Sequence, residues 1–241
     1  MLSDQQRARL FGVLFLITFV TSILALWLYQ PVLDDPVGYI AGAGNDNRIL
    51  LGAFLELLLI IANIGIAVVL YPIGRRQSEE LALGYVAARV FECMFIFLGI
   101  VAVLGVVTLR QEVAGSSEGT VAYTLAAIKD WTFLLGPGWV VGWGNGLILG
   151  YLMYKSELVP RQAAWLGLVG GPLVIVSGTL VMFAVDHEQG SLQGIATIPE
   201  FLWELFLGLY CTFKGFRPSS PLLQPRAGGD RVIPATKGDL R

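Results

Sequence analysis

Apolar residues in this chain form six long stretches, and short connections between them hold most of the polar and charged residues. Each stretch reaches the length of about 20 residues that a helix needs to cross the hydrocarbon core of a bilayer. None shows the strict apolar/polar alternation over ~10-residue segments that marks a membrane barrel. Because backbone groups in lipid must bond within their own segment, each stretch predicts a membrane-spanning helix. The predicted spans are Leu10–Tyr29, Ile49–Tyr71, Leu81–Leu109, Leu134–Tyr154, Ala163–Val185 and Leu192–Phe216.

The composition agrees with an all-α membrane protein built as a six-transmembrane-helix bundle. Of the 241 residues, 55% are hydrophobic and only 14% are charged, whereas a soluble domain has ~25% charged residues. We expect one membrane domain over residues 1–216. Residues 217–241 are rich in Pro, Gly and charge, so we expect a disordered cytoplasmic tail that cannot bury a core.

The distribution of basic residues predicts the orientation in the membrane. The side that holds both termini carries twelve of them: Arg7, Arg9, Arg75, Arg76, Lys155, Arg161, Lys214, Arg217, Arg226, Arg231, Lys237 and Arg241. The opposite side carries only Arg48, Arg110 and Lys129. Since basic residues concentrate in cytoplasmic connections, we expect both termini in the cytoplasm and a multi-pass protein of the cell (cytoplasmic) membrane.

Residues 119–135 have two interpretations. Lys129 and Asp130 interrupt this apolar stretch, and Trp131 follows them. It is either an extra outer amphipathic helix lying at the interface or an extension of the fourth span that kinks at Pro137. We favour the extension.

Three glycines in the fourth predicted span share one helical face. Gly142, Gly146 and Gly150 are spaced four residues apart, and a face of small residues allows close packing of helices in membranes. Packing within one chain is the interpretation we favour. A dimer interface is the alternative, so the oligomeric state is left open.

Charged residues within the predicted spans are the main candidates for function, because a charge at mid-bilayer costs at least ~2.5–3.5 kcal/mol. Helical rise places Arg89, Glu92 and Glu204 near one depth, together with the polar residue Asn63. Glu56 lies one or two turns above them. Arg89 and Glu92 share a face at spacing i, i+3, and Glu200 and Glu204 share one at i, i+4. The predicted polar cluster is Glu56, Asn63, Arg89, Glu92, Glu200 and Glu204.

The charges of this cluster do not balance. Arg89 can neutralise one carboxylate through a bidentate contact, which leaves Glu56 or Glu204 as the predicted unpaired acid. The excess of acids makes the cluster a candidate proton or ligand site. The alternative is structural: Arg89, Glu92 and Glu204 would tie the third span to the sixth.

No feature of the sequence predicts catalysis, a metal site or a cofactor. The only histidine, His187, lies beside Asp186 and Glu188 in an outer loop that we expect to be solvated, and metal sites need several ligands. No nucleophile elbow or phosphate-binding loop is present. Both cysteines, Cys93 and Cys211, fall within spans, so no structural disulfide is implied. We expect no nucleic-acid partner.

Four stretches together resemble an uncharacterised bacterial integral-membrane family, domain of unknown function 4386. They are Gly12–Thr21 in the first span, Arg89-Val-Phe-Glu92 in the third, Ser156-Glu-Leu-Val-Pro-Arg161 after the fourth, and Ile198-Pro-Glu-Phe-Leu-Trp-Glu204 with Lys214-Gly-Phe216 in the sixth. The resemblance covers about residues 7 to 216. It implies a six-helix membrane domain and supplies no activity, cofactor or catalytic residue.

Two functions fit these observations. The first is a small proton-linked transporter or carrier that uses the Arg/Glu cluster at the midplane. The second is a non-catalytic membrane protein that binds a lipid, a small ligand or a partner, with the cluster as structural glue. We expect the lipid bilayer, and a small ligand or proton, as partners, and we expect no enzymatic activity.

Overall fold

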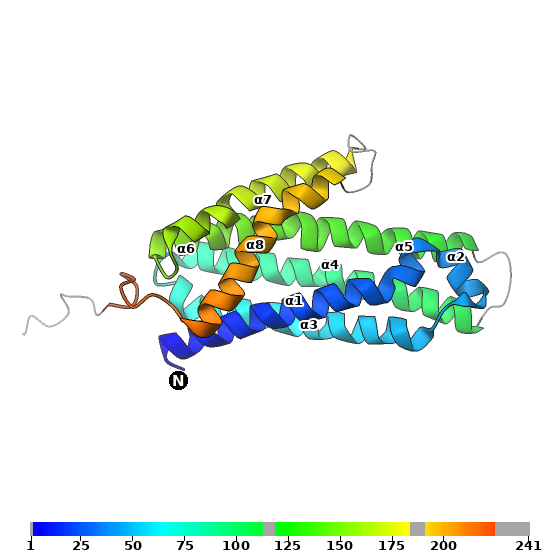
Figure 1. Cartoon of the computed structure of the whole chain (residues 1–241), viewed down its shortest axis with the longest axis horizontal. Coiled ribbons are helices and arrows are strands. Elements are labelled where there is room, and N and C mark those ends of the chain that lie inside the picture. The colour runs from blue at the N-terminus through cyan, green and yellow to red at the C-terminus, as the bar shows by residue number, and fades with distance from the viewer. Residues whose placement is uncertain (1, 113–118, 184–190, 225–241) are drawn as a thin grey trace, which may run out of the picture.

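A computed structural model gives the fold and describes residues 2–112, 119–183 and 191–224 (Figure 1). All regular structure in these ranges is helical. The long helices are α1 (Asp4–Asp34), α3 (Asp46–Gly74), α4 (Glu79–Glu112), α5 (Gly119–Phe133), α7 (Arg161–Met182) and α8 (Ser191–Phe213). The shorter elements are α2 (Pro36–Gly38), η1 (Tyr39–Ala43), η2 (Leu134–Val140), η3 (Gly142–Leu149) and α6 (Gly150–Ser156). In the described residues, six helical segments are long and apolar enough to cross a membrane.

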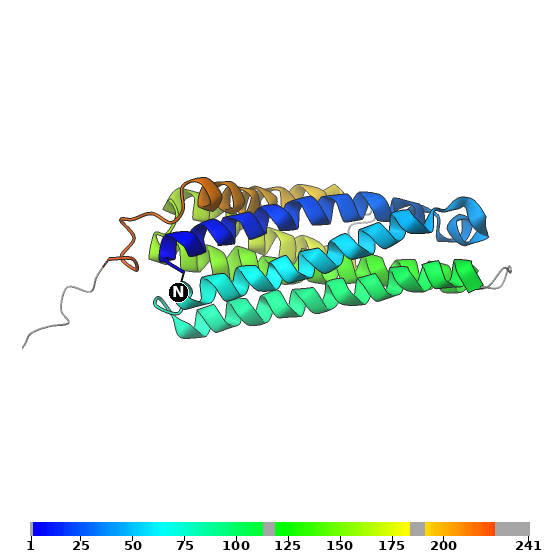
Figure 2. The ribbon, with the colours of Figure 1, turned by 90° about the horizontal axis from the view of Figure 1, so that it is seen from below.

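The six segments pack as a closed ring in chain order. α1 packs on α3, and α3 packs on α4. α4 packs on α5 and η2, which begin the fourth segment, and the end of that segment, η3 and α6, packs on α7. α7 packs on α8. α8 then returns to pack on α1 and closes the ring. Figure 1 shows α7 and α8 crossing the other helices obliquely, and Figure 2 shows the remaining helices running nearly parallel. A closed ring of helices leaves its inward faces directed at a common centre.

Most helices are longer than the predicted apolar stretches, because their polar ends are also helical. α1 begins at Asp4 rather than Leu10, since Ser3 and Gln6 form a reciprocal capping box. α4 has 34 residues, which corresponds to about 51 Å of helix. The apolar patterns therefore located the helices but underestimated the length of the first four, whereas α7 ends at Met182 and α8 at Phe213, before their predicted ends at Val185 and Phe216.

Residues 119–135 join the fourth span in one continuous helical segment, Gly119–Ser156. The segment changes to π-helical turns at η2, which contains Pro137, and remains irregular through η3. Proline lacks the backbone N–H of a regular helix, and π turns inside helices occur frequently at functional sites. The segment thus has an irregular middle, which faces the centre of the ring.

The glycine face of this segment packs against α7 of the same chain. A Cβ added at Gly142 would lie 2.6 Å from the carbonyl oxygen of Gly171, and one at Gly146 would lie 2.3 Å from the Gly171 Cα. A Cβ at Gly150 would lie 3.2 Å from the backbone nitrogen of Leu168. Side chains at these positions would push the two helices apart, so this face is used for packing within the chain.

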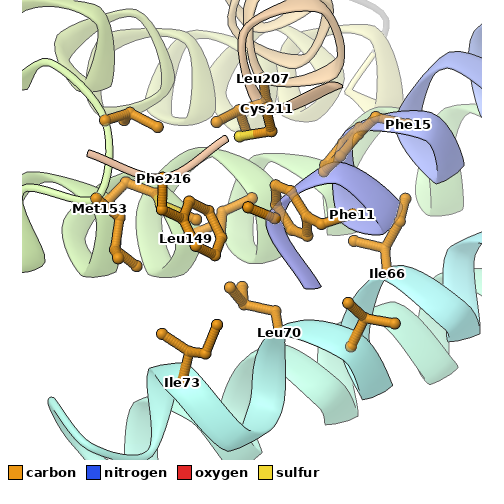
Figure 3. Close-up of a cluster of buried hydrophobic side chains, with 14 of the residues drawn as sticks. Phe11, Phe15, Ile66, Leu70, Ile73, Leu149, Met153, Leu207, Cys211 and Phe216 are labelled. Atoms are coloured by element: carbon orange, nitrogen blue, oxygen red, sulfur yellow. The ribbon is translucent and has the colours of Figure 1, made fainter. Parts of the chain in front are cut away.

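A cluster of buried apolar side chains fills the end of the ring that holds the N-terminus and the last described residues (Figures 1 and 3). Figure 3 shows its labelled members, which come from four separate parts of the chain, converging. The labelled members are Phe11, Phe15, Ile66, Leu70, Ile73, Leu149, Met153, Leu207, Cys211 and Phe216. We call this group the apolar plug.

The first residues of the expected tail lie against the plug. The Arg217 amide donates to the carbonyl of Leu158 at 2.8 Å. The Ser220 hydroxyl donates to the carbonyl of Ser156 at 2.6 Å, and Ser220 is fully buried. The boundary expected at residue 217 therefore does not mark the end of ordered structure, since residues 217–224 bind the α6–α7 connection. Residues 225–241 lie outside the described residues.

Candidate functional site

A pocket of ≈ 230 Å³ lies between the helices of the ring and is partly open to the outer surface, where Ile23, Phe133 and Phe201 are exposed; we call it the chamber. Its walls come from α1, α3, α4, α5, η2, α7 and α8. All six residues of the predicted polar cluster line it: Glu56, Asn63, Arg89, Glu92, Glu200 and Glu204. The apolar wall includes Phe19, Ile23, Leu59, Ile96, Phe133, Val141, Val174 and Phe201. The depth and helical-face arguments from the sequence thus selected residues that share one space.

The first polar group in the chamber is centred on Arg89 of α4, which is 3% exposed. Its Nη1 lies 2.7 Å from the Glu92 carboxylate, one turn away on the same helix. Its Nη2 donates to the side-chain carbonyl of Asn63 on α3. The Asn63 amide in turn donates to the second Glu92 oxygen at 3.2 Å. This closed triangle neutralises Arg89 and links α3 to α4.

The second polar group is an ion pair that the sequence interpretation missed. Lys129 of α5 is 3% exposed, and its Nζ lies 2.6 and 2.8 Å from the two Glu56 oxygens. The Tyr29 hydroxyl donates to the same carboxylate at 3.0 Å. We assigned Lys129 to an outer connection and left Glu56 as a candidate unpaired acid. The extension of the fourth helix brings Lys129 to α3, so Glu56 is paired and Glu204 remains as the other predicted alternative.

The third polar group holds Glu204 of α8. Asn145 of η3 donates from its side-chain amide to Glu204. The Asn145 carbonyl oxygens are also bound, one by the Tyr85 hydroxyl at 3.1 Å and the backbone one by the Trp203 indole at 3.0 Å. The ion pairs of Arg89 among the described residues do not include Glu204. The Arg89–Glu204 tie of the structural alternative is therefore absent there, and an amide holds Glu204 instead.

Glu200 is the acid of the chamber whose two carboxyl oxygens are both left without hydrogen-bond partners in the described chain. It is 2% exposed, and neither of its carboxyl oxygens has a hydrogen-bond partner among the described residues. A Cβ at Gly170 would lie 2.9 Å from its Oε2, and one at Gly146 would lie 3.0 Å away. The carboxyl group therefore lies against bare glycine backbone of α7 and η3. Buried polar atoms without partners are costly and uncommon in native proteins.

The helix around Glu200 is also irregular. Pro199 precedes it within α8. Because proline has no N–H, the carbonyl of Ile195, four residues earlier, lacks its usual intrahelical donor. The unsatisfied carboxyl thus lies next to a weakened turn of helix.

The chamber holds more acidic than basic side chains. Its wall carries two cationic side chains, Arg89 and Lys129, and four carboxyl groups. Glu92 and Glu56 pair with the two cations. Glu200 and Glu204, one turn apart on α8, remain without a cationic partner in the described chain. The excess of acid predicted from the sequence is present, and it resides on α8.

A second and larger cavity adjoins the chamber. It has a volume of ≈ 760 Å³. It lies between the α5–η2 segment, the end of α7 and the start of α8. Its wall includes Tyr123, Asp130, Trp131, Val181 and Gln193. We call it the antechamber. Phe133, Pro137 and Thr197 line both cavities, so these three residues form the partition between them.

Metal binding finds no support in the described chain. No group of three or more His, Cys, Asp and Glu side chains there is arranged to hold a metal ion. Cys93 and Cys211 are both buried and unpaired in this part of the chain. The loop with Asp186, His187 and Glu188 lies outside the described residues.

Comparisons with known proteins establish the family of the chain. No curated protein matches the chain, and no solved structure does. One family model matches residues 10–215, which include every residue that forms the chamber. The chain therefore belongs to the family described as Domain of unknown function (DUF4386).

Proposed function

We propose that this multi-pass membrane protein is a small carrier that moves a solute in a proton-linked cycle, with the chamber as its binding site. The observation that carries the proposal is Glu200, a deeply buried carboxyl with no partner among the described residues. A group of this kind destabilises the fold unless it serves a ligand or a proton. Active residues are commonly kept at such a cost in stability.

The arrangement of the polar groups separates support from function. The Lys129–Glu56–Tyr29 group is satisfied internally, and the Arg89–Glu92–Asn63 group is satisfied except for the Nε–H of Arg89. They link α1, α3, α4 and α5 and form the fixed wall of the chamber. Glu200 and Glu204 lie on α8, beside Pro199 and the π turns of the fourth segment. The irregular helices are thus the ones that carry or face the unpaired acids.

Access to the chamber is unequal at its two ends, as a carrier in one of its states requires. The apolar plug fills the end that holds the N-terminus and the last described residues. At the other end, only the partition of Phe133, Pro137 and Thr197 separates the chamber from the antechamber. We infer that both termini are cytoplasmic from the basic residues at their end, so the described state would open away from the cytoplasm.

The satisfied ion pairs also support a second candidate function, a non-transporting membrane protein that binds a ligand in the chamber. In that case α8 would not need to move, and the glycine contacts between η3 and α7 would hold one fixed state. Transport and static binding differ in a single observable, which is movement of solute or protons across a sealed membrane.

The test uses the full chain in proteoliposomes that enclose a pH-sensitive dye. Small ammonium, carboxylate, sugar and inorganic-cation solutes are added outside in turn, and the internal pH is followed. A carrier gives a solute-dependent pH change that Glu200→Gln abolishes. Glu157→Gln is the matched control, because Glu157 pairs with Arg161 on the surface, where their side chains are 34% and 52% exposed. A static binder gives no flux with any solute, and equal flux in Glu200→Gln and wild type would overturn the role given to Glu200.

A further inference from the structure

The unpaired groups in the chamber specify the charge of a ligand. Glu200 offers two buried carboxyl oxygens without donors in the described chain, and Glu204 lies one turn away on the same helix. Glu204 already accepts from Asn145, so Glu200 has the greater need for a donor. A ligand with N–H donors and a positive charge would satisfy it through charge-assisted hydrogen bonds. An anion would meet two acids instead.

The wall of the chamber specifies the rest of the ligand. Phe201, the residue after Glu200, makes an edge-to-face contact with Phe19 of α1, with ring centroids 5.0 Å apart. Both rings line the chamber, and aromatic faces attract organic cations. Ile23, Phe133 and Val174 add further apolar surface.

The volume limits the size of the ligand. The chamber measures ≈ 230 Å³, the space of about eight water molecules at ~30 Å³ each in the liquid. A molecule of about eight non-hydrogen atoms therefore fills it. The antechamber leads to it past Asp130, whose carboxylate would attract a cation along the way.

We propose that the chamber binds a small organic monocation, a protonated amine with an apolar body, whose ammonium group lies on Glu200 and whose body contacts Phe19 and Phe201. This deepens the carrier function proposed above, on which it rests, by naming the class of substrate. The Nε–H of Arg89 is a buried donor with no partner among the described residues, and it is the feature that would favour an anion.

Three probes of equal shape test the proposal by equilibrium binding to the full chain in detergent: benzylammonium, benzyl alcohol and benzoate. Calorimetry or quenching of tryptophan fluorescence follows the binding. Benzylammonium should bind more tightly than benzyl alcohol by about 10- to 150-fold, the factor that a charge-assisted hydrogen bond contributes. Benzoate should bind more weakly than either. Equal or tighter binding of benzyl alcohol or benzoate overturns the proposal.

Variants locate the site. Glu200→Gln should lose the preference for benzylammonium over benzyl alcohol, whereas Glu157→Gln should keep it. A Glu200→Gln protein that keeps the preference overturns the assignment to Glu200. The probe comparison in wild type needs no variant, so it decides the ligand class even where the substitution prevents folding. Solute-driven flux without benzylammonium binding refutes the proposed ligand class and leaves the carrier function standing. Benzylammonium binding without flux of any solute supports the binding site and refutes the carrier function.

Discussion

Replacing Lys129 by methionine should destabilise the protein strongly, because it leaves the Glu56 carboxylate buried without a cation. Lys129 Nζ lies 2.6 and 2.8 Å from the two Glu56 oxygens, and the two side chains are 4% and 9% exposed. Removing one member of a buried ion pair costs about 3–5 kcal/mol. The Tyr29 hydroxyl, 3.0 Å from Glu56, would still donate one hydrogen bond, so we expect the lower part of that range.

The double variant separates the ion pair from the loss of packing. Lys129→Met with Glu56→Gln removes both charges and keeps the Tyr29 contact. Since replacement of a whole buried pair is often close to neutral, the double variant should be more stable than either single variant. The coupling energy between the two sites should be about 2–3 kcal/mol, at the upper end of what contacting residues show.

Reversible unfolding of the purified protein in mixed micelles, followed by circular dichroism, gives the free energies for this cycle. Arg161→Met is the matched control, because it breaks a surface pair with Glu157 at 3.0 Å that should contribute no more than about 1 kcal/mol. A Lys129→Met protein as stable as the control variant, or effects that simply add in the double variant, would refute the buried pair.

Three further predictions concern packing, hydrogen bonding and orientation. Gly146→Ala should destabilise the protein by about 1–3 kcal/mol, because its Cβ would lie 2.3 Å from the Gly171 Cα. Gly194→Ala is the control: its Cβ meets no described atom within 4 Å, so it should be neutral or stabilise by about 0.5–1 kcal/mol. Unfolding in micelles compares the two variants. Tyr85→Phe should cost about 1–3 kcal/mol in the same measurement, since it removes the 3.1 Å donor to buried Asn145; an unchanged free energy would mean that Asn145 finds another donor. In intact cells an impermeant maleimide should label Asn45→Cys from outside and leave Gln77→Cys unlabelled, because these residues lie in turns at opposite ends of α3; the reverse pattern would contradict cytoplasmic termini.

The sequence predicted the helices and the chamber residues because those depend on local periodicity. Spacings of three and four residues put Arg89 with Glu92, and Glu200 with Glu204, on shared faces whatever the tertiary structure. Depth counted along each span then placed these residues at one level. The same arithmetic could not say which residues bind each other, because partner choice depends on the rotation of each helix about its axis.

Lys129 shows where local reasoning fails. Its neighbours include Asp130 and Trp131, which resemble an interfacial segment, and only the packing of α5 on α4 and α1 turns it toward Glu56. A signal was present in the sequence: Lys129 follows the apolar run Leu125–Ile128, and a lysine in such a run needs a carboxylate partner. Asn145 was missed for a similar reason, because the glycines around it drew attention to packing rather than to hydrogen bonding.

The Arg89–Glu204 contact of the structural alternative is not formed in the described chain. Arg89 binds a carboxylate one turn away on its own helix and an amide on α3, and its Nε–H has no partner there. Glu204 found Asn145 instead. The acid without any hydrogen-bond partner in the described chain is Glu200, whereas the sequence analysis had named Glu56 or Glu204 as the unpaired acid.

The central claim is that Glu200 is kept for function while Glu56 is kept for folding, and the unfolding free energies of Glu200→Gln and Glu56→Gln test it most directly. We predict that Glu200→Gln is as stable as wild type or more so, because it replaces a buried carboxyl that has no partner among the described residues. Glu56→Gln should lose stability, since it leaves the Lys129 ammonium buried without its carboxylate. A Glu200→Gln protein that loses as much stability as Glu56→Gln would contradict the claim and make all four carboxyls of the chamber structural.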